Sequence, residues 1–414
     1  MNRSDPYRIY LLAQAGDGFA MSLVITLNLV YQVTVVGLDP LQLVLVGTTL
    51  EVSYFLFEIP TGIVADMYSR KWSVIIGFAM IGAGFVLEGS IPEFGAVLGA
   101  QVLFGIGATF TSGAYEAWVA SETAPGRIGR GSSLGQVYLR GEQTHLLAAL
   151  AAIGVAVYLG REDVSTPIVA GGYLLGMLAL FLAFFMPEQH FERASARRRE
   201  TWAAFVESMR TAYRVVRSRR ALWLIVLVMF IWGGAAEGYD RLWTVHLIDG
   251  YDLPELLGIG LVGWFGIIRA GGMGLSILGA EIARRRIDTD SDYLLARTML
   301  VLTVVIAVAL VGLAYSPSFL FGVVAVWIVS GARNVLDPLL VTWVNGHSDE
   351  KVRATVLSGV RQAESLGEIA IGPGLGWIAR IGTVATALAS AAAVFGGSLF
   401  VWAKTLASDD PEPS

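Results

Sequence analysis

The sequence predicts an all-α integral membrane protein with twelve transmembrane helices, arranged as two pseudo-symmetric six-helix bundles. Three observations lead to this fold class. The chain of 414 residues is 55% hydrophobic and only 15% charged, and its mean hydropathy of +0.63 is far above that of a soluble protein. Long apolar segments recur along the whole chain, with one long polar stretch near the middle. Basic residues gather in alternate connections between these segments.

Twelve segments are long enough to cross a membrane as helices, because a span needs ~20 apolar residues. The basic connections between them are assigned to the cytoplasm by the positive-inside rule, so both chain ends are expected there and the protein in the inner membrane of a cell. The first segment follows no signal-peptide cleavage pattern and is expected to remain as an anchor. The predicted spans are roughly 8–36, 42–65, 72–90, 93–119, 132–160, 166–187, 220–248, 256–283, 293–315, 318–345, 352–378 and 380–405.

Residues 188–219 form the longest polar stretch between two spans. We therefore expect an N-terminal bundle (1–187), a cytoplasmic linker (188–219) and a C-terminal bundle (220–414). Apolar residues recur at helical spacing within the linker, with arginines between them, which predicts an amphipathic helix on the bilayer surface. These apolar residues are Trp202, Val206, Met209, Tyr213 and Val216.

Composition and motifs exclude several function classes. The chain has no cysteine, which excludes disulfides, thiolate zinc sites and cysteine nucleophiles. No span carries His-Glu-x-x-His, the paired aspartates of intramembrane proteases, or a serine with a histidine in helical register, so we expect no enzyme, metal or cofactor. The net charge of −5 is not gathered into a nucleic-acid footprint. The expected partners are a small-molecule substrate, protons and the lipid bilayer, for a monomeric protein.

A charged hinge separates the second and third spans. Gly62 and Asp66 lie four residues apart, and so on one helix face, where the glycine allows another helix to approach closely. Arg70 and Lys71 follow after a short turn and mark the cytoplasmic edge. Together these residues predict a gating device at the membrane surface.

This hinge resembles the loop signature between the second and third helices of the major facilitator superfamily. The resemblance implies alternating access, a central cavity lined by the first, fourth, seventh and tenth helices, and a lock in which Asp66 and its neighbouring arginine hold the outward-facing state. The runs around Glu58 and Glu116 resemble a bacterial efflux-permease branch of that family. One departure is Gln101, which stands where many proton-coupled members have an arginine; another is the absence of a glycine-proline signature from the fifth span.

The hinge pattern partly repeats in the second half of the chain. Glu281, Arg285 and Arg286 stand at the offsets of Asp66, Arg70 and Lys71, and the charges after the fourth span are echoed after the tenth. Such a repeat is typical of transporters built from two similar halves. We interpret these clusters as salt bridges that close the inner mouth, with gating residues Gly62, Asp66, Arg70, Lys71, Glu122, Arg127, Glu281 and Arg285.

Ionisable residues inside the spans indicate function, because each costs about 2.5–3.5 kcal/mol at mid-bilayer on insertion scales. Carboxyl groups outnumber arginines, so some must be protonated or meet a cation, which favours proton coupling. The acids are Asp17, Glu51, Glu58, Glu116, Glu142, Glu237, Asp240, Asp337, Glu364 and Glu368, and the arginines are Arg140, Arg241, Arg269, Arg333 and Arg361.

Helical spacing allows six of these charged groups to form three local pairs. Each pair can equally be structural or functional: Glu237 with Arg241, Arg333 with Asp337, and Arg361 with Glu364. Four residues have no obvious local partner and are the better functional candidates: Asp17, Glu51, Asp240 and Arg269.

Two further groups complete the candidate site. His145 can relay protons because imidazole titrates near neutral pH, or it can simply hydrogen-bond a neighbouring helix, and nearby Arg140 can receive an anionic substrate group. The resemblance implies that Tyr115 faces the cavity, and Trp232 and Tyr239 can form an apolar wall, with packing in the core as the alternative.

We therefore predict a secondary active transporter that exports an organic amphipathic molecule in exchange for protons. Asp17, Glu237 and Asp240 would carry protons or meet a cation, while Arg269 and Arg333 would orient an anionic group. The alternatives are a proton-coupled symporter that imports a small organic anion, and a receptor on the same fold that transports nothing.

Overall fold

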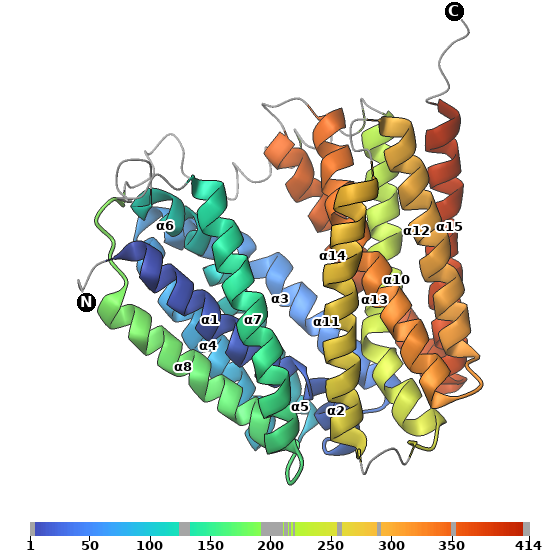
Figure 1. The fold of residues 1–414 in the computed structure, drawn as a ribbon, viewed down its shortest axis with the longest axis horizontal. Helices are drawn as coiled ribbons and strands as arrows, with labels where there is room; N and C mark the ends of the chain where they lie inside the picture. Colours follow the sequence, from blue (N-terminus) through green and yellow to red (C-terminus); the bar gives the residue numbers. More distant parts are fainter. Residues whose placement is uncertain are drawn as a thin grey trace, which may run out of the picture. The chain divides into compact units, whose positions relative to one another are not determined.

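The structure is a computed structural model of the chain. It describes residues 5–123, 133–191, 210, 214, 217, 220–254, 259–287, 291–348 and 353–408, with the backbone alone at 220–221, 354–355 and 403–408. The predicted amphipathic helix of the linker lies outside the described residues. The helices (Figure 1) are α1 (Pro6–Ile25), α2 (Asn28–Thr34), α3 (Pro40–Met67), α4 (Arg70–Ser90), α5 (Phe94–Thr111), α6 (Ala114–Glu122), α7 (Leu134–Gly160), α8 (Thr166–Phe185), α10 (Arg220–Gly250), α11 (Leu261–Arg286), α12 (Asp292–Ala314), α13 (Phe319–His347), α14 (Arg353–Ile381) and α15 (Val384–Ser408).

Short polar residues begin many of these helices. In each case the side-chain oxygen accepts a hydrogen bond from a backbone N–H of the first turn, which would otherwise lack a partner. This cap matters more in a membrane than in water, because lipid offers no replacement donor or acceptor. The capping residues are Asp5, Ser69, Ser133, Ser291 and Ser318.

The described helices include eleven spans that are long and apolar enough to cross a membrane. The remaining predicted span, 352–378, corresponds to α14, which is 29 residues long but carries Arg361, Glu364 and Glu368 in its middle. The chain is a multi-pass membrane protein.

The helices form two compact units. The N-terminal unit comprises Met1–Gly37 and Thr49–Phe205, and the C-terminal unit comprises Leu38–Thr48 and Val206–Ser414. The sequence assigns all of the second span to the first bundle, whereas residues 40–48 of α3 pack in the C-terminal unit. There the start of α3 lies on α14, because a Cβ on Gly376 would contact Val44 and Arg380 Nε lies 3.8 Å from Asp39 Oδ2.

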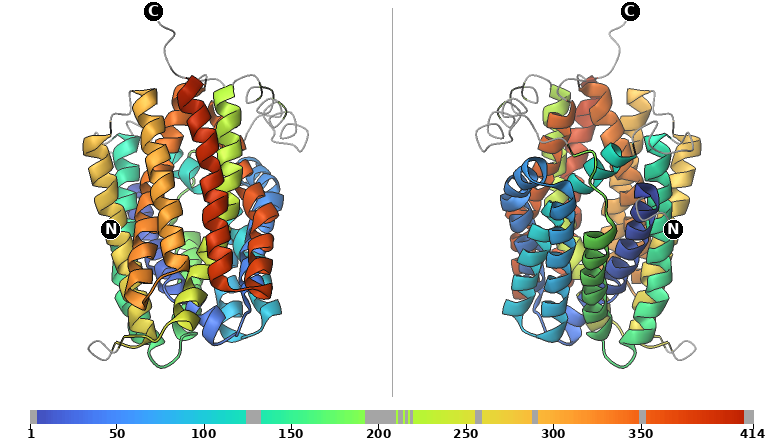
Figure 2. Two further views of the ribbon diagram at one scale, coloured as in Figure 1. Left: turned by 90° about the vertical axis from the view of Figure 1, so that its right-hand side faces the viewer. Right: turned by 90° about the vertical axis from the view of Figure 1, so that its left-hand side faces the viewer.

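Both units use the same pattern of helix pairs (Figure 1, Figure 2). In the N-terminal unit α1 packs on α7 and α8, and α4 packs on α5 and α8; in the C-terminal unit α10 packs on α14 and α15, and α12 packs on α13 and α15. When the spans are numbered in chain order within each unit, both units have contacts between the first and fifth, first and sixth, third and fourth, and third and sixth spans. The repeat seen in the sequence is therefore also a repeat of packing.

Glycines set one equivalent crossing in each unit. A Cβ on Gly18 of α1 would collide with the main-chain oxygen of His145 on α7, and a Cβ on Gly233 of α10 would collide with that of Glu364 on α14. Small residues allow such close backbone approach between membrane helices. The crossings make His145 and Glu364 equivalent positions in the two units.

Two predicted spans are broken. The first, expected to be continuous over 8–36, is α1 and α2 with a break at Thr26 and Leu27, and the fourth, expected over 93–119, is α5 and α6 with a break at Ser112 and Gly113. Gly113 has φ +69°, a left-handed conformation that glycine adopts without steric cost. Adjacent serine and glycine are a known cause of helix kinks, and this signal is present in the sequence at the second break.

Candidate functional site

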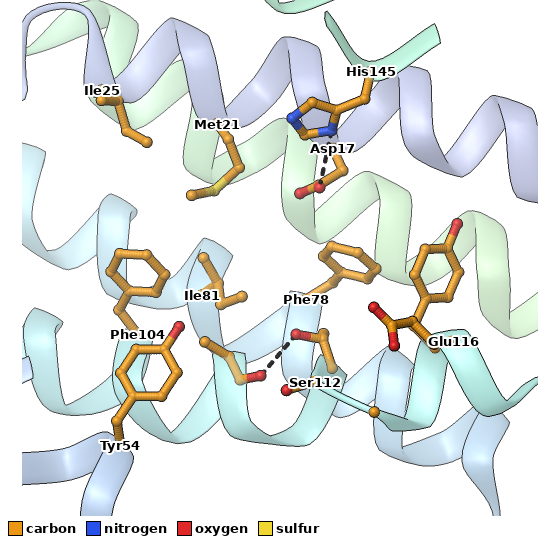
Figure 3. Close-up of a pocket in the computed structure, with 14 residues that line it drawn as sticks. Asp17, Met21, Ile25, Tyr54, Phe78, Ile81, Phe104, Ser112, Glu116 and His145 are labelled. Atoms are coloured by element: carbon orange, nitrogen blue, oxygen red, sulfur yellow. Dashed lines mark hydrogen bonds and ion pairs between the residues drawn. The ribbon is translucent and has the colours of Figure 1, made fainter. Parts of the chain in front are cut away.

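A cavity of about 560 Å³ lies inside the N-terminal unit (Figure 3). Ile25 lines it beside the break in the first span, and Ser112 and Gly113 line it at the break in the fourth. Small-molecule sites have volumes of this size, and broken helices are typical of transporter binding sites. The remaining lining residues are Asp17, Met21, Tyr54, Phe78, Ile81, Phe104, Ala108, Thr111, Tyr115, Glu116 and His145.

The cavity wall combines apolar and acidic groups. Aliphatic and aromatic side chains make up most of it, while Asp17, Glu116 and His145 are its ionisable groups. Among the described residues that line it, none is lysine or arginine. The wall therefore suits an amphipathic molecule whose polar group is neutral or cationic better than one that carries an anionic group.

Asp17 and His145 both lie in the wall of the cavity, and their side chains face one another (Figure 3). Asp17 Oδ2 lies 3.5 Å from His145 Nδ1, and the side chains are 25% and 29% exposed. The α1–α7 crossing holds this register, because Gly18 lies against the His145 carbonyl and Ser22 Oγ donates to the Ala149 oxygen at 2.8 Å. Helical spacing offers Asp17 no local partner; its partner comes from another helix.

Tyr115 and Glu116 reach the cavity from the start of α6. Tyr115 is stacked on Trp118 with ring centroids 6.0 Å apart and planes 2° apart, and its hydroxyl donates to the Tyr10 main-chain oxygen at 3.3 Å. Glu116 lies in the first turn of α6, where the helix dipole favours a negative charge. The break at Gly113 thus places an acid and an aromatic ring in the same wall.

Arg140 and Glu51, two other candidates of the N-terminal unit, are close in the sequence to residues that line the cavity. Arg140 is exposed, and its Nη1 donates to the Tyr7 hydroxyl at 3.2 Å. Glu51 is half-buried on α3, one turn before Tyr54, which lines the cavity.

The C-terminal unit brings its charged residues together as ion pairs. Glu237 Oε1 lies 3.1 Å from Arg241 Nε, and Glu364 Oε2 lies 3.0 Å from Arg361 Nη1, so both of these helical pairs are present. Charges that are deeply placed in a membrane protein are stabilised by such partners.

The close ion pair of Arg333 is with Asp240 on another helix, not with Asp337. Arg333 Nη1 lies 2.7 Å from Asp240 Oδ1 on α10, and its guanidinium lies 5.8 Å from the ring centre of Tyr239. Asp337 is exposed on α13. Helical spacing allowed Asp337, but the packing of α13 beside α10 offers Arg333 a carboxylate and an aromatic face together. Asp240, expected to lack a partner, therefore has one.

Trp232 and Tyr239 are buried in the C-terminal unit, which agrees with the alternative of core packing. Both side chains are 4% exposed. Trp232 Nε1 donates to Ser398 Oγ at 2.8 Å and its ring is stacked on Phe395, because the aromatic face of α10 is turned toward α15. The two residues are core residues of the C-terminal unit.

Arg269 is exposed on α11. Among the described residues of its unit it has no ion-pair partner. At the preceding residue, the main-chain oxygen of Ile268 accepts a hydrogen bond from Trp327 Nε1 at 2.9 Å.

The hinge after the second span has the predicted form. α3 contains Gly62 and ends at Met67, and α4 begins at Arg70, with Asp66 half-buried beside the turn. Arg70 Nη1 donates to the Ala117 oxygen at 3.2 Å, and the Lys71 backbone N–H donates to Glu188 at 3.0 Å.

The other predicted gates differ from this hinge. Glu122 is buried and accepts hydrogen bonds from the backbone N–H groups of Gln189 at 2.9 Å and His190 at 2.8 Å; its expected partner Arg127 lies outside the described residues. Glu281 lies 2.6 Å from Arg285, but α11 continues to Arg286 without a turn. That pair therefore lies along one exposed helix instead of across a loop.

Glu88, near the end of the predicted span 72–90, is a candidate that the sequence pattern did not single out. This residue is fully buried (0% exposed), and Gln101 Nε2 donates to its Oε2 at 3.2 Å. The signal was present, because Gln101 was already singled out as a polar residue in the place of an arginine.

Comparison with known proteins agrees with this geometry. The sequence profile of the Major Facilitator Superfamily matches residues 10–291. The chain belongs to the Major Facilitator Superfamily. It is 20% identical over 366 residues to an uncharacterized MFS-type transporter, YxaM, of Bacillus subtilis (strain 168), with 88% of this chain and 87% of YxaM covered.

Solved structures of the superfamily share its fold. The crystal structure of the nucleoside transporter NupG matches with a TM-score of 0.78 at 14% identity over 100% of each chain. A POT family transporter in complex with 5-aminolevulinic acid matches with a TM-score of 0.71 at 10% identity over 97% of this chain and 95% of that one. The chain is thus a non-enzymatic membrane transporter of the Major Facilitator Superfamily.

Proposed function

We propose that this transporter exports an organic amphipathic small molecule in exchange for protons, by alternating access. The observation that carries the proposal is the contact of Asp17 Oδ2 with His145 Nδ1 at 3.5 Å in the wall of the cavity. A carboxyl group and an imidazole that both face a ligand cavity can bind a proton in one step and the ligand in another.

The distribution of charge supports this assignment of the proton site. At the crossing equivalent to that of Asp17 and His145, the C-terminal unit has Glu364, which is paired with Arg361. Glu237 and Asp240 are likewise paired with arginines. Arginine remains charged at physiological pH, so these acids are compensated, whereas the partner of Asp17 is a histidine, whose imidazole can be neutral or charged.

The wall supports the substrate class. Rings of Tyr54, Phe78, Phe104 and Tyr115 provide aromatic faces, which attract cations as well as apolar groups. We further propose that the protein acts as a monomer in the inner membrane, with both termini in the cytoplasm, as the basic connections of the sequence suggest.

The polarity of a pH gradient tests the proposal in proteoliposomes. The probes are ethidium as an aromatic cation, carboxyfluorescein as an aromatic anion, and uridine, because NupG is a nucleoside transporter. For an antiporter, an acidic interior should drive ethidium inward as protons leave. For a symporter, only an acidic exterior would drive accumulation, because proton and substrate move together.

Import of a small organic anion is the second candidate function. Arg269, an exposed arginine within α11, favours it because a guanidinium binds carboxylate and phosphate groups well. Accumulation of carboxyfluorescein with an acidic exterior, and its loss in Arg269→Gln, would support this function and overturn the first. Binding of a probe without flux at either gradient would leave a receptor.

A further inference from the structure

One buried carboxyl group of the N-terminal unit does not line the cavity. Glu88 on α4 is fully buried (0% exposed). Its Oε1 accepts hydrogen bonds from Asn28 Nδ2 at 2.8 Å and Gln32 Nε2 at 2.7 Å, and its Oε2 accepts one from Gln101 Nε2 at 3.2 Å. Side-chain amides from α2 and α5 thus enclose the carboxyl group; we call Glu88, Asn28, Gln32 and Gln101 the amide cluster.

We propose that Glu88 is a second proton-binding site of the transporter, in which the amide cluster accommodates both the carboxylate and the carboxylic acid. An amide carries two donors and an acceptor, so by turning over it can donate to a carboxylate or accept from an acid. A guanidinium has no acceptor and can serve only the carboxylate. The chemical nature of the cluster therefore suits a group that changes its protonation state.

One atom of the amide cluster could accept a hydrogen bond from a protonated Glu88. Gln32 Oε1 is buried and has no hydrogen-bond partner among the described residues, a condition that is costly inside a protein. Gln32 Nε2 donates to Glu88 Oε1 at 2.7 Å and to Asn28 Oδ1 at 3.0 Å. A half-turn of the amide would give up both bonds, and with Asn28 turning as well it would bring Oε1 to the same place beside Glu88. A carboxylic acid O–H on Glu88 would then donate to it.

The cluster is separated from the cavity by aromatic rings. Ile81 and Phe104 line the cavity; further along the same helices, Phe85 packs on Phe104 with ring centroids 5.2 Å apart. Glu88 and Gln101 follow about one turn beyond these rings. Proton exchange at Glu88 is therefore distinct from that at Asp17, although α1 and α2 of the first span connect the two.

The titratable neighbours of Glu88 can be distinguished from it. The Tyr31 hydroxyl donates to the Glu88 main-chain oxygen at 2.7 Å, and Asp163, between α7 and α8, acts on Tyr31 through its charge. Hydrogen bonds from Ser165 lower the pKa of Asp163 below its ordinary value, so Asp163 stays ionised near neutral pH. From α8, Ile168 and Val169 pack beside Gly89 and add no charge.

Infrared spectroscopy of the purified full-length protein tests the proposal. A buried carboxylic acid gives a C=O stretching band that a carboxylate lacks. We expect wild type to show such a band, and the band to decrease as the pH is raised. It should be absent from Glu88→Gln and retained in Glu93→Gln, a matched change at an exposed residue that precedes α5. Identical spectra of wild type and Glu88→Gln at every pH would overturn the proposal.

A second variant keeps the test decisive if Glu88→Gln does not fold. Gln101→Met removes one hydrogen-bond donor and keeps a similar side-chain length, so it should shift the frequency of the Glu88 band. An unshifted band would refute the assignment. The band should also persist in Asp17→Asn, so failure here and failure of proton coupling at the cavity give different results.

Discussion

His145 on α7 lies opposite Asp17 on α1, with Nδ1 3.5 Å from Oδ2. The two residues are far apart in the sequence and meet because Gly18 lets the helices cross at the His145 carbonyl. Of the acids singled out from the sequence, Asp17 has an imidazole for its partner, whereas Glu237, Asp240 and Glu364 have guanidinium groups. An imidazole can gain or lose a proton, whereas a guanidinium remains a cation.

Replacement of Asp17 by asparagine should uncouple transport. Gradient-driven accumulation of the transported probe should fall more than about tenfold, equivalent to about 1.4 kcal/mol, because the amide cannot carry a proton. Exchange of labelled for unlabelled probe without a gradient should continue. Asp163→Asn, at an exposed acid in the connection before α8, is the control. Full accumulation in Asp17→Asn would exclude Asp17 as the coupling site.

Replacement of His145 by glutamine should alter the pH dependence of transport. Wild-type rates should change with pH, because protonation of His145 changes the charge beside Asp17. Glutamine can still hydrogen-bond Asp17 but has no such titration, so its profile should be flatter. The rates are measured at equal internal and external pH. Profiles that coincide would show that His145 only packs against α1.

Alanine at Gly18 should destabilise the N-terminal unit. Its Cβ would collide with the His145 main-chain oxygen, and overpacking of this kind costs about 1–3 kcal/mol. Thermal unfolding in detergent gives the comparison. Gly154→Ala on α7 is the matched control, because a Cβ there meets nothing within 4 Å; its stability should be unchanged or slightly higher. Equal melting temperatures for both variants would mean that the crossing can relax.

The pair of Asp240 and Arg333 should contribute to stability and leave coupling intact. Asp240→Asn and Arg333→Met should each lower the melting temperature, while the double variant should lose less than the sum, with a coupling energy of about 0.5–3 kcal/mol for contacting residues. The partial exposure of both side chains, 44% and 31%, favours the lower part of that range. Loss of gradient-driven accumulation in a stable Asp240→Asn variant would instead assign the proton to the C-terminal unit.

Pairs within one helix were the most predictable part of the site. Glu237 with Arg241 follows directly from four-residue spacing, since such residues share a helix face. Arg333 shows the limit of that rule: Asp337 has the right spacing, but Asp240 on the neighbouring helix offers the shorter contact. Spacing along one helix says nothing about which other helix is adjacent.

Breaks in helices were harder to predict than the spans themselves. The hydropathy of 93–119 is continuous, yet the backbone turns at Gly113 and directs Tyr115 and Glu116 toward the cavity. Glu88 was missed because a carboxyl group near a span end is expected to reach water. Its burial depends on Asn28, Gln32 and Gln101, which come from two other helices.

The sequence by itself determined that this chain is a membrane protein with repeated halves and an excess of acids in its spans, because hydropathy, charge asymmetry and motif spacing are properties of the linear chain. Only the tertiary structure decided which acids face a partner on another helix. That choice depends on glycine-mediated helix crossings and helix breaks, which bring together side chains that no local spacing relates.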